Sequence, residues 1–399
     1  MQELIIKYPS YVKKALDRIA EAGHEAFVVG GAVRDAILGR TINDYDITTS
    51  ATPEETADIF SDLHVIMTGI KHGTVTVVID HKPIEITTYR VDGDYKDSRH
   101  PDGVRFTRNI EDDLSRRDFT VNAMAHNEKR GLVDLFGGKA DLEAKLIRAV
   151  GEPQRRFEED ALRIMRAFRF ASKLGFDIAE ETLDAARKCR KGLEHISNER
   201  KTVELEGIML GERVKKALLL MNQTKIFDVI MPDISLDLTR FNSISELPSD
   251  FACRMAFCLV GQKSTDVYIS SLRLSNAVSG KMKKLVHLAE ERLDADSDPT
   301  LRRLMSRAGN ELGELLAIKK ALGENTEGIA ERARRIIERG DCLNLKSLAV
   351  DGRDLTLMGI GGKEVGEILA VLLEAVLDDP TKNDRLILLD MARELQSRH

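Results

Sequence analysis

Two aspartates separated by one residue are the first sign of chemistry in this sequence. Asp44 and Asp46 stand in the segment Asp-Tyr-Asp-Ile, which we interpret as a strand. Successive strand side chains point to opposite faces of a sheet, so residues two apart share a face. Two adjacent carboxylates repel each other unless a cation lies between them, and hard oxygen ligands favour Mg²⁺. The pair predicts a metal site, although an Asp-x-Asp alone is more often a solvated strand face.

A pair of glycines precedes the aspartates. Gly30 and Gly31 follow the apolar run Phe27–Val29, which suits a buried strand, and they precede a short segment with helical spacing that stops at Gly39. Glycine permits close backbone approach, and a helix N-terminus offers free N–H groups to an anion. A strand, two glycines, a short helix and an Asp-x-Asp pair together predict a nucleotide and metal site within one segment.

Further charged residues extend this candidate site. Glu85 lies in a β-rich hairpin pattern, where it supplies a third carboxylate or stands as an exposed strand glutamate. Arg116-Arg117-Asp118 places a basic pair beside an acid. Such a group can bind phosphate and ribose together, and it can equally form a surface ion pair.

A third group of charges lies on a helix predicted over residues 157–176. Its members share helical spacing: Glu159, Asp160, Arg163, Arg166 and Arg169. Arg163 follows the two acids by three and four residues, so it is expected to lie over both. Ordinary helix salt bridges explain this spacing. A carboxylate and a guanidinium held together can also pair with the edge of a base.

The elements that position these residues fall into two kinds. Strand and helix signals interleave up to about residue 150, and beyond it the chain is nearly all helical. Ser10 is expected to cap a helix that runs to about Ala22, and Thr52 with Pro53 to begin a helix that ends near residue 60. A long polar loop is expected over residues 90–109, and internal breaks at 231–233 and 243–250.

Composition narrows the class of protein. The chain has 399 residues, of which 42% are apolar, an ordinary value for a globular protein. Its net charge of −6 argues against coating nucleic acid by bulk positive charge, although 60 Lys and Arg leave room for a local basic face. No membrane span or secretory signal is expected. Four cysteines with spacings that suit neither zinc nor disulfides indicate a reducing, cytoplasmic location.

Basic side chains in the last third of the chain leave two interpretations open. They track a phosphate backbone or cover solvated helix faces. They are Lys281, Lys283, Lys284, Arg302, Arg303, Arg332, Arg334 and Arg335.

Four motifs in order resemble those of the class II tRNA nucleotidyltransferases, or CCA-adding enzymes, and of the related bacterial poly(A) polymerases. The resemblance is strong over residues 25–210 and loose beyond. The motifs are Gly30-Gly31-Ala32-Val33-Arg34-Asp35 with Asp44-Tyr45-Asp46, then Arg116-Arg117-Asp118-Phe119-Thr120-Val121-Asn122-Ala123-Met124-Ala125, then Glu159-Asp160-Ala161-Leu162-Arg163, and finally the structural motif Ser197-Asn198-Glu199-Arg200.

The resemblance implies an α+β fold of seahorse shape. Its polymerase-β-like head with a mixed β-sheet would span residues 1–150, followed by an all-helical neck at 151–210, body at 211–270 and tail at 271–399 that binds tRNA. It also implies nucleotide-binding roles for several residues: Gly30, Gly31, Arg34, Arg117, Asp118, Asn122, Glu159, Asp160, Arg163, Arg166 and Arg169. Asp44 and Asp46 would bind two Mg²⁺ ions, Asp118 the ribose, and Asp160 with Arg163 the base.

The implied reaction is the addition of C, C and A to the 3′ end of tRNA from CTP and ATP, with release of pyrophosphate. The full-length loop at 90–109 favours complete CCA addition over a poly(A) polymerase or a partial adder. A silent RNA-binding protein is disfavoured by the Asp44 and Asp46 pair, and a dehydrogenase by the absence of G-x-G-x-x-G. No membrane and no obligate protein partner are expected.

Overall fold

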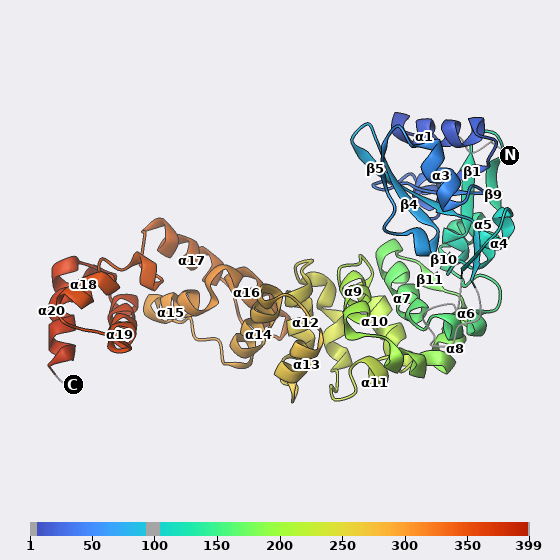
Figure 1. Ribbon diagram of the computed structural model, residues 1–399. Coiled ribbons are helices and arrows are strands. Elements are labelled where there is room, and N and C mark those ends of the chain that lie inside the picture. The colour runs from blue at the N-terminus through green and yellow to red at the C-terminus, as the bar shows by residue number, and fades with distance from the viewer. Residues whose placement is uncertain (1–5, 93–103, 398–399) are drawn as a thin grey trace. The chain divides into compact units, whose positions relative to one another are not determined.

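The computed structural model describes residues 6–92 and 104–397 (Figure 1). It divides into two compact units, residues 1–232 and 233–399. The division falls inside the break predicted at 231–233, whereas the boundaries predicted at residues 150, 210 and 270 stay predictions. Part of the polar loop predicted over 90–109 lies outside the described residues, so its bearing on complete CCA addition is also a prediction.

A seven-stranded mixed sheet forms the centre of the first unit, as the sequence predicts. Its strand order is β3-β4-β5-β2-β1-β8-β9. β2 and β5 pair in parallel, and the other neighbours pair antiparallel. The strands are β1 (Ala26–Val29), β2 (Asp46–Thr49), β3 (His64–Ile66), β4 (Thr74–Ile79), β5 (Lys82–Thr88), β8 (Met124–Asn127) and β9 (Gly131–Asp134). A separate antiparallel pair is formed by β6 (Arg90–Asp92) and β7 (Val104–Phe106).

Helices around the sheet bury its apolar side chains. Phe27 and Val29 of β1 share a core cluster with Ile110 and Leu114, which lie on α4. The helices are α1 (Ser10–Glu21), α2 (Gly31–Ile37), α3 (Pro53–Ile59), α4 (Ile110–Ser115) and α5 (Gly138–Glu143), and a short 3₁₀ turn, η2, spans Thr120–Asn122. This packing fixes β1 and β2, which flank the predicted glycine and aspartate motifs.

The sequence predicts helix starts at Thr52 and at Ser10, and only the start at Thr52 is confirmed. Thr52 accepts a hydrogen bond from the backbone N–H of Glu55, whose carboxylate accepts from the N–H of Thr52, so a full capping box begins α3. The prediction that Ser10 caps α1 is wrong. Pro9 occupies the cap position and Ser10 is already helical, because the fixed φ of proline suits the residue before the first turn.

The predicted single helix over residues 157–176 is two helices. α6 spans Pro153–Glu159 and α7 spans Leu162–Leu174, with Asp160 in extended conformation between them. The Asp160 carboxylate accepts the backbone N–H of Leu162 at 3.0 Å. Aspartate competes in this way with the helical hydrogen-bond pattern, so it interrupts the helix and restarts it. The break gives Asp160 an orientation that a continuous helix would not allow.

More helices complete the first unit, with one strand pair beyond the predicted end of the sheet region. β10 (Leu146–Ile147) pairs in parallel with β11 (Asp177–Ile178), so strand structure continues past residue 150. The remaining helices are α8 (Glu180–Cys189), α9 (Asn198–Met209), α10 (Val214–Gln223) and α11 (Phe227–Ile230). α7 packs most extensively against α9.

The second unit is helical throughout its described part. Its α-helices are α12 (Phe251–Leu259), α13 (Thr265–Ser271), α14 (Asn276–Glu290), α15 (Asp298–Ala308), α16 (Leu312–Ala321), α17 (Ile329–Glu338), α18 (Gly352–Leu357), α19 (Glu364–Asp378) and α20 (Arg385–Gln396). One apolar cluster joins α15, α16 and α17, and another joins α18, α19 and α20. No helix among the described residues is long and apolar enough to cross a membrane.

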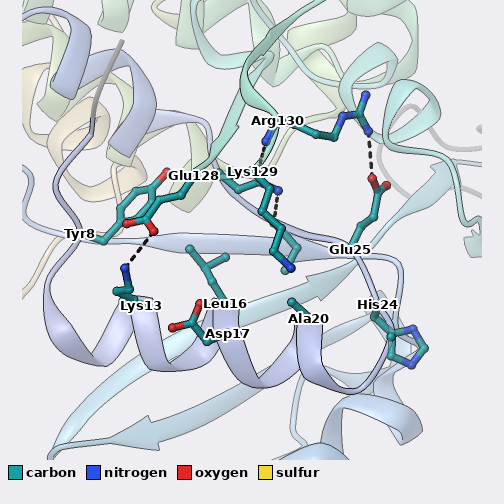
Figure 2. Close-up of a pocket in the computed structure, with 13 residues that line it drawn as sticks. Tyr8, Lys13, Leu16, Asp17, Ala20, His24, Glu25, Glu128, Lys129 and Arg130 are labelled. Atoms are coloured by element: carbon teal, nitrogen blue, oxygen red, sulfur yellow. Dashed lines mark hydrogen bonds and ion pairs between the residues drawn. The ribbon is translucent and has the colours of Figure 1, made fainter. Parts of the chain in front are cut away.

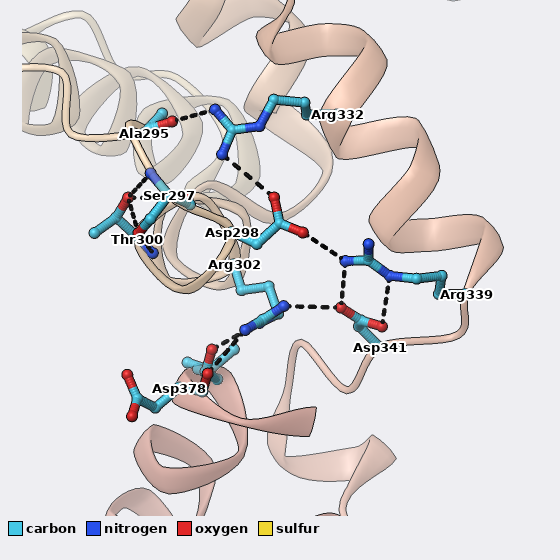
Figure 3. Close-up of polar contacts among 10 residues, drawn as sticks. Ala295, Ser297, Asp298, Thr300, Arg302, Arg332, Arg339, Asp341 and Asp378 are labelled. Carbon is cyan, nitrogen blue, oxygen red and sulfur yellow. Dashed lines mark hydrogen bonds and ion pairs between the residues drawn. The ribbon is translucent and has the colours of Figure 1, made fainter. Parts of the chain in front are cut away.

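A buried arginine ties α15 to α19 (Figure 3). Arg302 is 4% exposed and donates to the backbone carbonyls of Leu377 and Asp378, at 2.7 and 2.9 Å, and to the carboxylate of Asp341 at 3.1 Å. Arg302 therefore neither follows a phosphate backbone nor covers a solvated helix face, the two interpretations left open for the basic side chains of this region. It is an internal structural cation.

Candidate active site

A cavity of about 800 Å³ opens in the first unit. The predicted site residues that line it are Gly30, Gly31, Arg34, Asp44, Asp46, Arg117, Asp118, Asn122, Asp160, Arg163, Arg166 and Arg169. Ten of them come from three of the four sequence motifs, and Arg166 and Arg169 lie further along α7. Glu85 and Glu159 do not line the cavity. Residues outside the predicted set also line it: Arg116, Leu162, Phe170, Lys173 and Arg200.

Three carboxylates crowd together at one end of the candidate site. Asp46 begins β2 and stands beside Glu85 of β5 in the parallel register, and Asp44 precedes it by two residues. All three are exposed, whereas the intervening Tyr45 is buried, so Asp44 and Asp46 face the same way as predicted. Desolvation by the surrounding protein raises the pKa of Asp46, and Asp44 and then Glu85 raise it further, against a lowering by Arg117.

This crowding fits a divalent cation held by a pair of carboxylates. Over residues 6–92 and 104–397, no three His, Cys, Asp or Glu side chains form a group that could hold a metal ion. Glu85 stands beside Asp46 in the strand register, and its part as a third ligand stays a prediction. A pair of carboxylates is enough protein ligation for some divalent cations, because water and substrate phosphates supply the remaining oxygens.

The glycine pair lies where a guanidinium covers the backbone. Gly30 has φ of +71°, a conformation that favours glycine, and ends β1 at the start of α2. A Cβ at Gly30 would lie 3.4 Å from Nη1 of Arg117. Arg34 is 5% exposed and donates through Nη1 to Asn122 at 2.7 Å and through Nε and Nη2 to Asp35 at 2.9 and 3.0 Å. Arg34 of α2 and Arg117, which follows α4, thus both lie beside the glycines.

Arg117 is held by an acid that the motif did not identify. Its Nη2 donates to Asp113 at 3.0 Å, and Arg116 donates to the other oxygen of the same carboxylate at 2.6 Å. Burial would raise the pKa of Asp113, but the nearby Arg117 and Arg116 outweigh it and hold the pKa below its usual range. The Nε of Arg117 is buried and has no hydrogen-bond partner within residues 6–92 and 104–397. Asp113 thus orients the guanidinium of Arg117 while it occupies only one of the N–H donors of that group.

Asp118 is enclosed rather than open to solvent. Its Oδ2 accepts two hydrogen bonds from Arg166, at 2.9 and 2.7 Å, and its Oδ1 accepts from Asn122 at 3.2 Å and from the backbone of Phe119 at 2.8 Å. Burial would raise the pKa of Asp118, but Arg166 and these hydrogen bonds together lower it. The ion pair considered for Arg116-Arg117-Asp118 is therefore not internal to the motif, because its members pair with Asp113 and Arg166.

The helix break separates Asp160 from Arg163, the two residues predicted to bind the base. Arg163 donates to Glu159 at 2.8 Å and to the backbone carbonyl of Arg116 at 3.1 Å. Asp160 instead accepts from Arg200 of α9 at 3.0 Å. The prediction that Arg163 lies over both acids is thus wrong for Asp160, because that residue leaves the helical path. Nη1 of Arg200 is buried without a hydrogen-bond partner.

Two further arginines of α7, Arg166 and Arg169, pair with the same acid on α9. Glu204 is 5% exposed, and it pairs with Arg169 at 2.6 Å and with Arg166 at 3.9 Å. Phe170, beside them, is 7% exposed and lines the cavity. Sequence reasoning missed these partners, because a buried Glu and a Phe at helical spacing look like ordinary elements of a packed helix.

A second cavity in the same unit has a different character (Figure 2). It measures about 330 Å³ and lies between α1 and the turn that joins β8 to β9. Charged side chains at its rim pair with each other, Lys13 with Glu128 at 2.9 Å and Arg130 with Glu25 at 3.0 Å. Its rim charges are thus largely compensated, whereas the carboxylates of the first cavity repel one another.

Comparisons with known proteins agree with this geometry. Residues 26–148 match the family model described as the poly A polymerase head domain, and residues 175–238 match one described as a probable RNA and SrmB-binding site of polymerase A. The head fold and the residues around the first cavity define a nucleotidyltransferase that carries this head domain.

Full-length relatives define the family. The chain is 37% identical to the CCA-adding enzyme of Pediococcus pentosaceus, over 96% of this chain and 97% of that one. It is 37% identical to that of Bacillus velezensis, over 91% and 92% of the two chains. The crystal structure of the Bacillus stearothermophilus CCA-adding enzyme in complex with CTP superposes with a TM-score of 0.83 at 32% identity, and covers 98% of this chain and 99% of that one. The chain belongs to the CCA-adding enzyme family.

Proposed function

We propose that this protein adds C, C and A to the 3′ end of tRNA from CTP and ATP and releases pyrophosphate. The observation that carries the proposal is the shared cavity. One space of about 800 Å³ is lined by a carboxylate pair, a glycine pair with two arginines, and an acid with two arginines from the helical side. These groups suit a metal, a triphosphate and a base, the three parts that nucleotidyl transfer must position.

Asp44 and Asp46 are the proposed metal ligands. Nucleotidyltransferases of this family generally act with divalent metal ions, and the oxygen donors favour Mg²⁺ here. Burial and then repulsion by Asp44 and Glu85 raise the pKa of Asp46, and a bound cation would favour the ionised carboxylate against both. When bound, the ion would supply charge stabilisation for the attacking and leaving oxygens of the transfer.

Arg117 and Arg34 are proposed to bind the triphosphate over Gly30 and Gly31. A guanidinium carries five N–H donors. Arg34 commits three of them to Asn122 and Asp35, and Arg117 commits one to Asp113. Both therefore retain donors for phosphate oxygens, and the missing glycine side chains let the phosphates approach the backbone.

Asp118 is proposed to contact the ribose only after a rearrangement. Two donors already reach each of its oxygens, so a 2′-hydroxyl must displace one of them. In the resting site Asp118 instead orients Arg166. The nucleotide thus competes with Arg166 for this carboxylate.

Asp160 and Arg163 are proposed to read the base edge. Each oxygen of Asp160 accepts one hydrogen bond, from Leu162 or from Arg200, which leaves lone pairs for an exocyclic amino group. C and A both present an amino donor beside a ring-nitrogen acceptor, whereas G and U present a carbonyl beside an N–H. Asp160 as the acceptor and Arg163 as the donor match this pattern, so together they would select C and A and reject G and U.

The direct test is incubation with a tRNA transcript that lacks its 3′ CCA, with Mg²⁺ and labelled nucleotides. CTP alone should extend the transcript by two nucleotides, and CTP with ATP by three and then stop. GTP and UTP should give no product. A poly(A) polymerase remains the second candidate, because the head model is named for that activity. A long adenosine ladder would establish it, and arrest after CC or addition of A alone would indicate a partial adder.

The proposed setting follows from the substrate. tRNA maturation and nucleoside triphosphates belong to the cytoplasm, and the four cysteines are all free thiols. We therefore place the protein there, with tRNA, CTP and ATP as its partners. Fractionation of cells followed by detection of the protein would test this placement.

A further inference from the structure

One aromatic ring at the cavity wall gathers three guanidinium groups. Phe170 of α7 has the Cζ atom of Arg169 at 4.2 Å from its ring centroid, and those of Arg34 and Arg166 at 5.5 Å each. Phe119 packs against it edge to face, with ring centroids 5.8 Å apart. The three arginines reach Phe170 from two elements, α2 and α7, and all of them line the cavity.

Three like charges around one ring need compensation. Each arginine has its own acid: Arg34 pairs with Asp35, Arg166 with Asp118, and Arg169 with Glu204. These acids neutralise charge, but they also consume N–H donors. The negative face of an aromatic ring attracts a cation without consuming any donor. The ring can therefore hold a guanidinium in place and leave its remaining N–H groups free for a ligand.

The ring also links the two halves of the proposed site. Arg34 stands at the phosphate end, one turn after the glycine pair, and Arg166 stands on α7, beyond the base-reading residues. A nucleoside triphosphate must meet both ends at once. A common contact that fixes the two arginines relative to each other would remove part of the ordering cost of binding.

We propose that Phe170 is a positioning residue for the incoming nucleotide, which acts through the attraction of its ring for Arg34, Arg166 and Arg169. This rests on the proposed function, because it assigns the ring a part in binding CTP and ATP. Phe170 makes the arginine cluster rigid before the nucleotide arrives. Its loss is expected to weaken nucleotide binding more than it slows the chemical step.

The first test compares two leucine variants of α7. Phe170→Leu removes the ring and keeps an apolar side chain. Phe168→Leu is the matched control, since Phe168 is fully buried in the same helix and takes part in none of the cation–ring contacts found among the described residues. We expect the KM for CTP and ATP to rise about tenfold in Phe170→Leu with kcat changed less than about threefold. Phe170→Tyr, which keeps the ring, should restore most of the affinity.

The second test separates electrostatics from packing. Phenylalanine analogues with one, two, three or five ring fluorines, incorporated at position 170 in the full chain, weaken the negative face of the ring and change its size little. CTP affinity, measured by calorimetry without tRNA, should fall stepwise along this series. A flat series, or equal losses in Phe170→Leu and Phe168→Leu, would overturn the proposal.

The wild-type protein in the tRNA extension assay keeps the two proposals distinguishable. A wild-type protein that fails to add C, C and A contradicts the proposed function. Normal addition by wild type, together with a flat fluorine series, contradicts only the role of Phe170. Fluorinated proteins that keep the wild-type melting temperature exclude misfolding as the cause of a lower affinity.

Discussion

The cavity of the first unit and the Arg302 network of the second are built from the same residue types, yet they differ in how their charges are balanced. Arg302 is 4% exposed, and the hydrogen bonds of its guanidinium among the described residues end on the backbone carbonyls of Leu377 and Asp378 and on Asp341. In the cavity, Nε of Arg117 and Nη1 of Arg200 have no hydrogen-bond partner among the described residues, and burial together with the nearby Asp44 and Glu85 raises the pKa of Asp46. Arginine–carboxylate pairing by itself therefore does not identify a functional site.

The partners of Arg302 explain its structural role. Leu377 and Asp378 end α19, and the last carbonyls of a helix have no partner within the helix. A cation there satisfies these carbonyls and also faces the negative end of the helix dipole. Arg332 and Arg339 extend the network through Asp298 at 3.3 and 2.9 Å (Figure 3). Backbone carbonyls of α19 thus accept the hydrogen bonds of Arg302, whereas the cavity of the first unit can admit a ligand.

The largest expected effect comes from removing one of the crowded carboxylates. Asp46→Ala or Asp44→Ala should lower nucleotide addition by about a thousandfold or more, because a metal ion contributes several kcal/mol to stabilising the charges of the transfer. Binding of tRNA, measured by gel shift, should stay within about twofold of wild type. Asp58→Ala, which removes an exposed carboxylate on α3, serves as the control. Near-normal addition by either cavity variant would contradict the metal assignment.

A smaller effect, on stability rather than activity, is expected from Arg302→Met. The variant keeps much of the side-chain volume but removes the donors to the Leu377 and Asp378 carbonyls and leaves Asp341 with Arg339 alone, so we expect a loss of about 3 kcal/mol in the free energy of unfolding. Arg303→Met is the matched control. Its pairs with Glu374 and Asp378 are exposed, and such pairs contribute at most about 1 kcal/mol. Denaturant unfolding followed by circular dichroism measures both, and equal losses would remove the distinction between the two arginines.

The sequence was most informative where function depends on local spacing. Asp44, Asp46, Gly30 and Gly31 are close in the chain, so strand alternation and glycine chemistry are enough to group them in one candidate site, and all four line the same cavity. The mixed sheet and the helical remainder were also predicted and are confirmed. These features rest on short-range patterns that tertiary structure rarely reverses.

Prediction failed where partners come from distant segments. Asp160 looks like part of a helix with Arg163, but its hydrogen bonds to Leu162 and Arg200 take it out of that helix. Asp113 stands three and four residues before Arg116 and Arg117, so its pairing follows local helical spacing. Glu204 and Phe170, by contrast, have no local signal. Their roles depend on which side chains the packing of α7 on α9 and on the head brings within reach, and helical periodicity alone cannot supply that information.

The smallest expected effect tests the charge imbalance directly, through the pH dependence of stability. The pKa of Asp46 is raised in the folded protein, so its ionised form costs stability, and this cost develops as the pH rises through that raised pKa. At pH 7 and without metal, Asp46→Asn should therefore melt higher than wild type by on the order of 1 °C, and the difference should vanish as the pH falls and wild-type Asp46 becomes protonated.

The opposite sign is expected for an enclosed carboxylate of the same cavity. The pKa of Asp118 is lowered, so its ionised form stabilises the fold above the ordinary carboxyl pKa and loses this contribution as the pH falls. Asp118→Asn should therefore melt lower than wild type at neutral pH, with a difference that shrinks on acidification. Adding Mg²⁺ should raise the melting temperature of wild type but not that of Asp46→Asn, since a ligand stabilises only the protein that binds it. Differential scanning fluorimetry across pH would show both signs, and a lower melting temperature for metal-free Asp46→Asn would contradict the repulsion on which the metal site is argued.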